Sequence, residues 1–413
     1  MRSAILVLFS TAGFAAPADF SELLSRVKAG SPKLAESIQA SMKANEVKNG
    51  TAVMSVGGDF VFAIESAAEP TLLFDDQPAD KMIRAAGSSL WAAAAKLATS
   101  RTHNFVYKVN GEIKGGKTDV PAFGPYAYEK AGVPRGKLSE KMVHESKIYP
   151  GMKSDYWVYA PAQYSAATPA AVMVWQDGEV LINRELPYRS QIVWDNLTAE
   201  KKIPVMIHVL ISPGLAGQRR MRSIEYDTVD DTYPRFILQE ILPEVAKAYN
   251  LRTDGYSRAI AGDSSGGICA FNAGWWRPEE FGRILSRIGS FTSIQWQPGK
   301  LDGGNVYPNM IRKQVKRNLR VWLQDGTQDI ENEHGSWPLQ NIQMANSLKM
   351  LGYDFHLAMG NGTHSRMGGN VEMAEELIWL WRGYDAFKTS EVFEMDPAEK
   401  GKPFFRVKIA NRE

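Results

Sequence analysis

The strongest candidate for catalytic chemistry is a serine flanked by glycines, in the stretch Gly262-Asp263-Ser264-Ser265-Gly266-Gly267. It follows the apolar run 258–261 and precedes another at 268–271, which predicts a strand, a sharp turn and a helix. This pattern is typical of a nucleophile elbow, in which the residues two before and two after the serine are small, so that strand and helix can approach closely. The elbow would put Ser264 at a helix N-terminus, where backbone N–H groups, including that of Ser265, favour the negative charge of an attacked carbonyl. A plain glycine turn has the same local pattern, so the interpretation depends on residues elsewhere.

A serine nucleophile of this kind needs a histidine base in a loop after a later strand. His364 lies in the glycine-rich loop 360–365, directly after the last predicted strand at 354–358. It is therefore the expected base, and His334 is the second choice. The alternative for either residue is that it is a surface histidine with no catalytic role.

The acid that orients the base is expected in the loop after the predicted strand 319–323, which offers Asp325 and Asp329. The acid must reach the far nitrogen of the imidazole and stabilise the imidazolium. A position several residues past the strand end gives the loop room to turn back toward His364. This consideration favours Asp329 over Asp325.

The second oxyanion N–H in such an architecture comes from the loop after an early strand. Here that loop is Gln176-Asp177-Gly178-Glu179, after the predicted strand 171–175. We expect the N–H group of Asp177 or Gly178 to lie beside that of Ser265. The alternative is that the Asp177 side chain only forms a turn.

Composition excludes several classes of protein. With 413 residues, 44% of them hydrophobic, the chain can bury a core large enough for two domains. The net charge of +2, without any basic run interleaved with aromatics, argues against nucleic-acid binding. The single cysteine, Cys269, excludes internal disulfides and cysteine-based zinc clusters, and we expect it to be a buried apolar residue.

Residues 1–18 have the pattern of a secretory signal peptide. Arg2 precedes the apolar run 4–9, and small residues follow, with cleavage expected after Ala15 or Ala18. The apolar run is too short to span a membrane. We therefore expect a periplasmic or secreted protein without a membrane span; an apolar N-terminus of a cytoplasmic protein is the alternative.

In the rest of the chain, the pattern of apolar residues changes from one region to the next. Apolar residues at helical spacing predict two short helices at 19–48, and short β-rich runs then predict an immunoglobulin-like β-sandwich at 49–119. The proline- and glycine-containing stretch 120–146 is expected to be a linker. At 147–390 apolar strands alternate with helical patterns, which predicts an α/β domain with a mostly parallel sheet. Residues 391–413 are expected to be a C-terminal tail.

Several motifs in register resemble a known group of enzymes. They are Val174-Trp175-Gln176-Asp177-Gly178, Arg222-Ser223-Ile224-Glu225-Tyr226-Asp227, the glycine-flanked serine, Leu323-Gln324-Asp325-Gly326-Thr327-Gln328-Asp329 and the Gly-Thr-His loop. This combination resembles the enterochelin-esterase-like branch of the esterase D superfamily, which includes feruloyl and acetylxylan esterases of carbohydrate esterase family 1. The resemblance runs from about residue 136 to 384, and more faintly across the β-sandwich, which looks like the early-set domain of these enzymes.

The resemblance implies an α/β-hydrolase fold with a triad of Ser264, Asp329 and His364. One departure is visible, because the last loop is Gly-Asn-Gly-Thr-His where Gly-Gly-His is common. The rim next to His364 is therefore expected to differ. Trp337, in a Gly-Ser-Trp-Pro stretch, is a candidate aromatic wall for substrate, with burial in the core as the equal alternative.

The expected function is that of a serine carboxylic ester hydrolase, which acts through an acyl-enzyme on short acyl or aryl esters, acetyl or feruloyl, of carbohydrate. Catecholate siderophore trilactones are the other substrate that the resemblance implies. An acyltransferase and a non-catalytic glycan-binding protein are the rival functions. This chemistry requires no metal or organic cofactor, and an ester is the expected partner.

Overall fold

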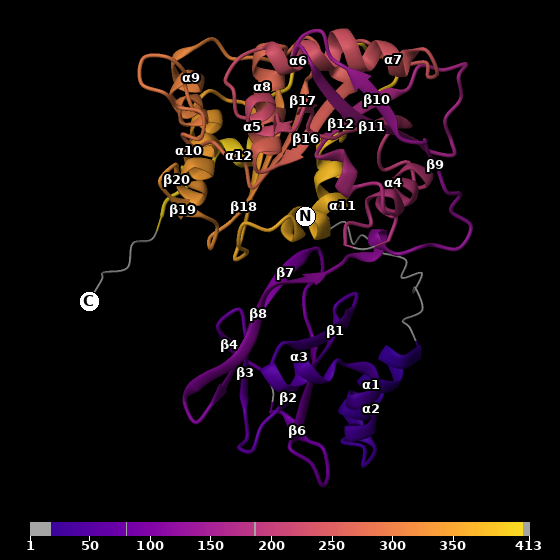
Figure 1. The fold of residues 1–413 in the computed structure, drawn as a ribbon, viewed down its shortest axis with the longest axis vertical. Coiled ribbons are helices and arrows are strands. Elements are labelled where there is room, and N and C mark those ends of the chain that lie inside the picture. The colour runs from indigo at the N-terminus through magenta and orange to yellow at the C-terminus, as the bar shows by residue number, and fades with distance from the viewer. Residues whose placement is uncertain (1–17, 80, 186, 408–413) are drawn as a thin grey trace, which may run out of the picture.

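The protein has a β-rich N-terminal part and a larger α/β part, one below the other in Figure 1. The computed structural model describes residues 18–407 except 80 and 186, so the expected signal peptide falls outside the described residues except for its last position. Within these residues, we find no helix with the length and apolar character that crossing a bilayer requires.

Two four-stranded antiparallel sheets form the N-terminal part, in the orders β1-β2-β6-β5 and β4-β3-β7-β8. Their strands are β1 Ala52–Val56, β2 Asp59–Glu65, β3 Thr71–Phe74, β4 Gln77–Pro78, β5 Ile83–Arg84, β6 Leu90–Lys96, β7 Arg101–Val109 and β8 Glu112–Ala122. Phe60 and Phe62 of β2 pack with Phe105 and Tyr107 of β7 in one buried cluster, because alternate residues of a strand face the same side. The predicted β-sandwich is confirmed.

Three short helices cover the outer face of the first sheet: α1 Ala18–Ala29, α2 Leu34–Ser41 and α3 Ala44–Asn49. Leu23, Val27 and Ile38, which recur at helical spacing, are buried against Val61 of β2. The sequence predicted two helices here. The additional helix α3 ends at Gly50, whose φ of 67° is a left-handed conformation that suits glycine.

The stretch 120–146, expected to be a linker, contains strands of the large sheet. β9 Lys137–Leu138 and β10 Met142–Glu145 both pair antiparallel with β11 Met152–Ala160. Strands this short show no periodicity along the sequence, so only the pairing with β11 distinguishes them from a loop.

The α/β part is built on a mixed, mostly parallel sheet with the order β15-β14-β11-β13-β12-β16-β17-β18-β21. Its further strands are β12 Ala171–Gln176, β13 Met206–Ile211, β14 Leu215–Ala216, β15 Arg219–Arg220, β16 Arg258–Asp263, β17 Arg283–Arg287, β18 Arg320–Gly326 and β21 Asp354–Gly360; β19 Glu331–Asn332 and β20 Gly335–Ser336 form a separate hairpin. The strands from β13 to β21 in this order are parallel, so their carboxyl ends lie along one edge. This is the predicted α/β-hydrolase fold.

Helices cover both faces of the sheet, which is why its central strands are apolar along their whole length. Phe271 of α8 and Met344 of α10 belong to the core on one face, and Trp194 of α4 and Leu377 of α11 to the core on the other. The helices are α4 Ser190–Ala199, α5 Arg222–Tyr226, α6 Thr232–Phe236, the π-helical turn Ile237–Ile241, α7 Leu242–Ala246, α8 Ser265–Trp276, α9 Tyr307–Lys313, α10 Trp337–Met350, α11 Met367–Leu380 and α12 Pro397–Lys400.

Candidate active site

Ser264 lies on a strained turn between β16 and α8, at the carboxyl edge of the sheet. Its φ of 61° and ψ of −121° form a conformation that residues other than glycine rarely adopt. The turn is so tight that a Cβ at Gly262 would lie 2.4 Å from the carbonyl oxygen of Gly266. Only glycine fits there, as the elbow pattern predicts.

The three side chains expected to form a triad come together from distant parts of the chain. Oγ of Ser264 lies 2.8 Å from Nε2 of His364, and Nδ1 of His364 lies 2.6 Å from Oδ1 of Asp329. Each residue follows a parallel strand: Ser264 follows β16, Asp329 follows β18 and His364 follows β21. In this arrangement an imidazole can remove the serine proton while a carboxylate fixes the ring. His334, the second choice, lies in the β19–β20 hairpin.

Asp325, the other candidate acid, is fully buried next to Asp329. Its Oδ1 accepts the backbone N–H of Gly326 at 2.7 Å, and its Oδ2 accepts Nδ2 of Asn341 at 2.8 Å. Burial and the neighbouring Asp329 raise the pKa of Asp325 to about 9, so this carboxyl is protonated at neutral pH. Burial alone would raise the pKa of Asp329 too, but hydrogen bonds from His364 and Asp325 hold it below its usual value. Asp329 is therefore the charged member of the pair.

We expect Asp325→Asn to remove a pH dependence of stability between about pH 5 and pH 8. A carboxyl whose pKa rises on folding contributes stability below its unfolded pKa and loses that contribution as the pH approaches its folded pKa, here about 9. The melting temperature of the wild type should therefore fall, relative to that of the variant, as the pH rises. Thermal denaturation of both proteins across this range measures the effect. A constant difference in melting temperature would contradict a protonated Asp325.

The three backbone N–H groups expected at an oxyanion site do not all have the same environment. The N–H of Asp177 donates to the buried hydroxyl of Tyr226 at 3.2 Å, so it is directed into the protein. This corrects the expectation that included Asp177. Gly178 and Ser265 are the first residues of the 3-10 turn Gly178–Val180 and of α8, where an N–H group has no carbonyl of its own helix to bind. These two N–H groups remain candidates for an oxyanion site.

Trp337 does not form the expected substrate wall, because its side chain is buried, with 3% exposed. Its ring packs edge-on against the imidazole of His364, with 5.6 Å between the ring centroids. Its Nε1 donates to Oγ of Ser290 at 3.1 Å, and that oxygen lies 3.3 Å from Oγ of Ser264. Trp337 and Ser290 therefore support the triad from the protein side. The sequence contains no signal for Ser290, since its role depends on contacts with distant residues.

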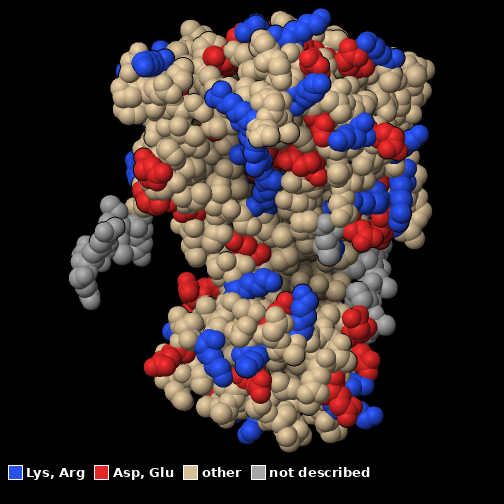
Figure 2. All heavy atoms as spheres, in the orientation of Figure 1, with Lys and Arg blue, Asp and Glu red and all other residues tan. Residues whose placement is uncertain are grey.

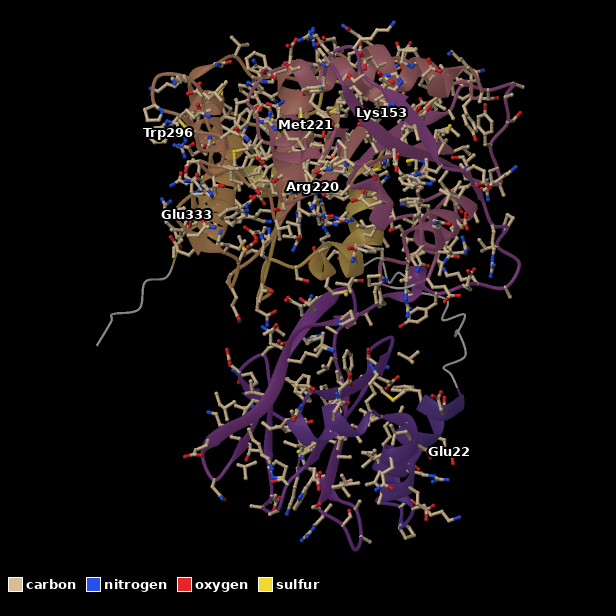
Figure 3. The ribbon with its side chains drawn as sticks, in the orientation of Figure 1. Glu22, Lys153, Arg220, Met221, Trp296 and Glu333 are labelled. Carbon is tan, nitrogen blue, oxygen red and sulfur yellow. The ribbon has the colours of Figure 1, made fainter. Side chains whose placement is uncertain are left out.

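Basic side chains surround the mouth of the site. A cavity of about 440 Å³ at Ser264 and His364 is also lined by Arg220, Arg222 and Arg366. In Figure 2, Lys and Arg atoms form a column over the α/β part, in the region where Figure 3 labels Arg220. A negatively charged substrate would be attracted to this opening.

Asp177 holds two of these arginines in place. Its carboxylate accepts Nε and Nη2 of Arg222 at 2.7 Å each, and Nη2 of Arg366 at 2.7 Å. Burial would lower the pKa of Arg222, but Asp177 holds it above its usual value, so the guanidinium stays charged. Sequence reasoning missed this cluster, although Asp177 and Arg222 both lie in motifs that carry the family resemblance. Arg220, in contrast, is exposed at the end of β15.

The sequence is similar to a family model and to characterised proteins that are all described as esterases. A family model described as "Putative esterase" matches residues 149–380. The iron(III) enterobactin esterase of Dickeya dadantii (strain 3937) is 24% identical over 191 residues, which are 46% of this chain and 43% of that protein. An endo-1,4-beta-xylanase/feruloyl esterase of Xylanibacter ruminicola is 30% identical over 149 residues, 36% of this chain and 18% of that protein. The chain thus spans less than half the length of these relatives.

The overall fold is also similar to a solved structure. The enterobactin esterase from Shigella flexneri, determined in the presence of enterobactin, aligns with a TM-score of 0.54 and 17% identity. The alignment covers 82% of this chain and 97% of that chain, so it includes part of the N-terminal region as well as the α/β part. At this identity the similarity concerns the fold.

Proposed function

The chain belongs to the esterase family whose model covers residues 149–380, and on that premise we propose that it cleaves esters through a covalent acyl-Ser264 intermediate. The observation that carries this proposal is the unbroken hydrogen-bonded series from Ser264 through His364 to Asp329, at 2.8 and 2.6 Å. A charged, partly desolvated acid, a histidine and a serine in this order are the parts that acyl transfer needs.

In the proposed reaction, Nε2 of His364 takes the hydroxyl proton while Oγ of Ser264 attacks the ester carbonyl. The N–H groups of Ser265 and Gly178 stabilise the resulting oxyanion. His364 then protonates the leaving alcohol. In the second half of the reaction, the same imidazole deprotonates a water molecule that attacks the acyl carbon, and it returns this proton to Oγ of Ser264 as the acid is released. Asp329 keeps the proton of the ring on Nδ1 and stabilises the imidazolium in both halves of the reaction.

The proposed substrate is an anionic ester, of which a ferric catecholate trilactone is the best match. The three arginines lining the Ser264 cavity outnumber its two carboxylates, and this excess of positive charge supports the choice, because the tris-catecholate iron complex is strongly anionic. The other lining residues are Asp177, Glu179 and Ile288. The described wall of this cavity thus offers no Phe, Tyr or Trp ring for a feruloyl group to stack on. Carbohydrate esters, favoured by the sequence, are the second arm of the test.

A substrate panel distinguishes these possibilities. Hydrolysis of p-nitrophenyl acetate, methyl ferulate, acetylated xylan and a ferric catecholate trilactone is compared, with kcat/KM expected to be highest for the trilactone. Repeating each reaction with an added carbohydrate acceptor tests acyl transfer, which would give mainly transferred product. A protein that only binds glycans would hydrolyse none of them, and a fluorophosphonate would not label Ser264.

We also propose a periplasmic or secreted location for the protein. The apolar segment within residues 1–18, which has the pattern of a signal peptide, supports this location.

Arg220→Gln is expected to raise KM for the anionic trilactone by about 2- to 5-fold, because it removes one exposed charge from the cavity mouth. The KM for the neutral p-nitrophenyl acetate should not change. Arg219→Gln is the matched control, since Arg219 is an exposed arginine on the same strand β15 but is not among the residues that line the cavity. Steady-state kinetics at low salt measures both. Equal effects of the Arg220 change on the two substrates would contradict an electrostatic role in substrate binding.

A further inference from the structure

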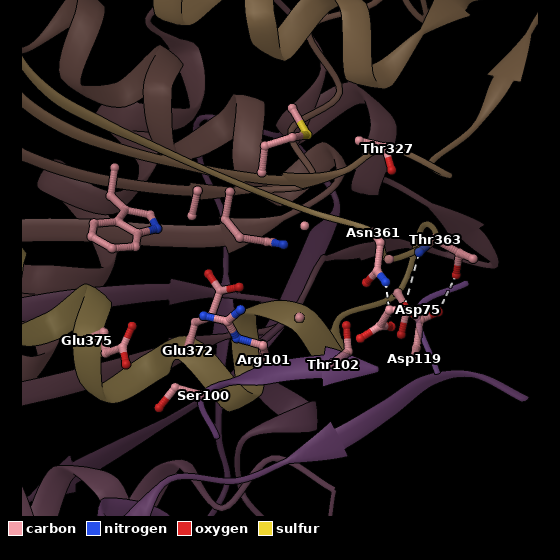
Figure 4. A pocket seen from close by; sticks show the side chains of 18 of the residues that line it. Asp75, Ser100, Arg101, Thr102, Asp119, Thr327, Asn361, Thr363, Glu372 and Glu375 are labelled. Carbon is pink, nitrogen blue, oxygen red and sulfur yellow. Dashed lines mark hydrogen bonds between the residues drawn. The ribbon is translucent and has the colours of Figure 1, made fainter. Parts of the chain in front are cut away.

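The loop that carries His364 is bound from outside its own domain, by the β-sandwich. Oδ1 of Asp119, in β8, accepts the backbone N–H of Thr363 at 3.1 Å, and its Oδ2 accepts the Thr363 hydroxyl. Figure 4 shows both bonds, with the Asp119 side chain pointing from the sandwich toward the loop. Thr363 immediately precedes His364, so these bonds act on the backbone next to the imidazole.

A second pair of contacts holds the same loop two residues earlier. Nδ2 of Asn361 donates to Oδ1 of Asp75 at 2.6 Å, which is also drawn in Figure 4. Nδ2 of Asn104 donates to the carbonyl oxygen of Asn361 at 3.0 Å. The loop is thus bound to the sandwich through both a side chain and its backbone.

The sandwich side of this contact is itself well ordered by hydrogen bonds. Asn104 connects the two aspartates, because its Oδ1 accepts the backbone N–H of Asp119 at 3.0 Å and its own backbone N–H donates to Oδ1 of Asp75 at 2.9 Å. Oδ2 of Asp75 lies 2.8 Å from Nδ1 of His103. The pairing of β7 with β8 shifts register at this point, and such bulges change the direction of side chains.

The other side of the loop packs against the turn that leads to the triad acid. The N–H of Gln328 donates to the carbonyl oxygen of Gly362 at 3.0 Å. A Cβ at Gly326 would lie 2.1 Å from that same oxygen, so the two backbones are in close contact. The loop is therefore clamped between the turn before Asp329 and the sandwich.

Next to the clamped loop, packing between the two parts of the protein is incomplete. A cavity of about 540 Å³ lies there, and Figure 4 shows Arg101 of β7 and Glu372 of α11 among the side chains that line it. Gln324 of β18 also lines it. The polar contacts at Asn361 and Thr363 lie beside this unfilled space and join the loop directly to the sandwich.

We propose that Asp119 is a positioning residue for His364, and that the β-sandwich is in this way part of the catalytic apparatus. The inference rests on the proposed function, in which His364 is the base. Asn361 and Thr363, the two residues other than glycine that precede His364 in this loop, are those that bind the sandwich. A catalytic group displaced by about 1 Å loses about 10²-fold in rate, so a modest loosening of this loop has a large effect.

Thr363→Val tests the contact with little change in shape, because valine keeps the branched side chain and loses only the hydroxyl that donates to Asp119. We expect kcat for p-nitrophenyl acetate to fall about 10-fold, with KM within about 3-fold of the wild type. Thr363→Ser restores the hydroxyl and should restore most of kcat. The melting temperature of both variants is measured as well. If Thr363 were needed only for folding, kcat would not fall at a nearly constant KM while the melting temperature stayed unchanged.

Asp119→Ala removes both acceptors and is expected to lower kcat about 10- to 100-fold. Because the φ of Asp119 is 53°, alanine adds backbone strain there, so Asp119→Asn, which tolerates this conformation and keeps one acceptor, is measured beside it. In the Asp119→Ala background, Thr363→Val should have no further effect. Additive losses in this double-mutant cycle would overturn the proposal, since the two residues would then act independently.

Asp59→Asn is the matched control, because Asp59 is another β-sandwich carboxylate, in β2, whose hydrogen bond is to exposed Lys96 at 2.8 Å. It should keep the wild-type kcat. Full activity of Thr363→Val and Asp119→Ala, with kcat of Ser264→Ala still lowered about 10⁴-fold or more, would overturn the positioning role and leave the esterase mechanism intact. If wild-type Ser264 is neither labelled by a fluorophosphonate nor required for hydrolysis, the proposed function fails, and the inference fails with it.

Discussion

Ser264→Ala is expected to lower kcat by about 10⁴- to 10⁶-fold, with KM nearly unchanged. The hydroxyl is the only protein group in the proposed mechanism that forms a bond to the acyl carbon, and alanine leaves the elbow backbone and the oxyanion N–H groups in place. Some hydrolysis over the uncatalysed rate should remain, because those N–H groups still stabilise the transition state. Steady-state kinetics with p-nitrophenyl acetate, and mass spectrometry after fluorophosphonate treatment, measure the two consequences.

Ser293→Ala is a suitable control for this substitution. Ser293 follows β17, and its hydroxyl donates to the carbonyl oxygen of His334 at 2.9 Å, outside the triad. Its variant should be labelled at Ser264 at the wild-type rate. Retention of more than about one tenth of wild-type kcat in Ser264→Ala would show that a different group is the nucleophile.

Asp329→Asn is expected to lower kcat by about 10⁴-fold, because an amide donates to Nδ1 of His364 and so favours the tautomer that cannot accept the serine proton. The bond of 2.6 Å between Asp329 and His364 makes this tautomer control direct. The dependence of kcat on pH should differ from that of the wild type as well, since the imidazolium that forms on His364 no longer has a charged partner. The measurement is kcat across the neutral pH range.

Asp325→Asn provides the contrast within the same pair of carboxyl groups. Because burial and Asp329 raise the pKa of Asp325 to about 9, this residue is already neutral, and an amide is close to it in shape and charge. Its kcat should stay within about 10-fold of the wild type. A larger loss in Asp325→Asn than in Asp329→Asn would assign the role of triad acid to Asp325.

The sequence by itself determined the features that depend on local spacing. Glycines at 262 and 266 are required by a turn in which backbones touch, so the elbow around Ser264 is visible in the sequence alone. The change from β-rich runs to alternating strands and helices likewise predicted a β-sandwich followed by an α/β domain with a mostly parallel sheet. The family resemblance implied the α/β-hydrolase fold, and the fold and family are confirmed. Residue types, their period and their order along the chain contain this information.

Only the tertiary structure decided the features that depend on contacts between distant residues. It directed the N–H of Asp177 toward Tyr226, buried Trp337 under the imidazole, and assembled the arginines around the mouth of the site. It also brought Asp119 of the sandwich to the loop of His364. Each of these depends on which surfaces pack together and which buried polar groups must find partners, and no period or motif along a single chain records those pairings.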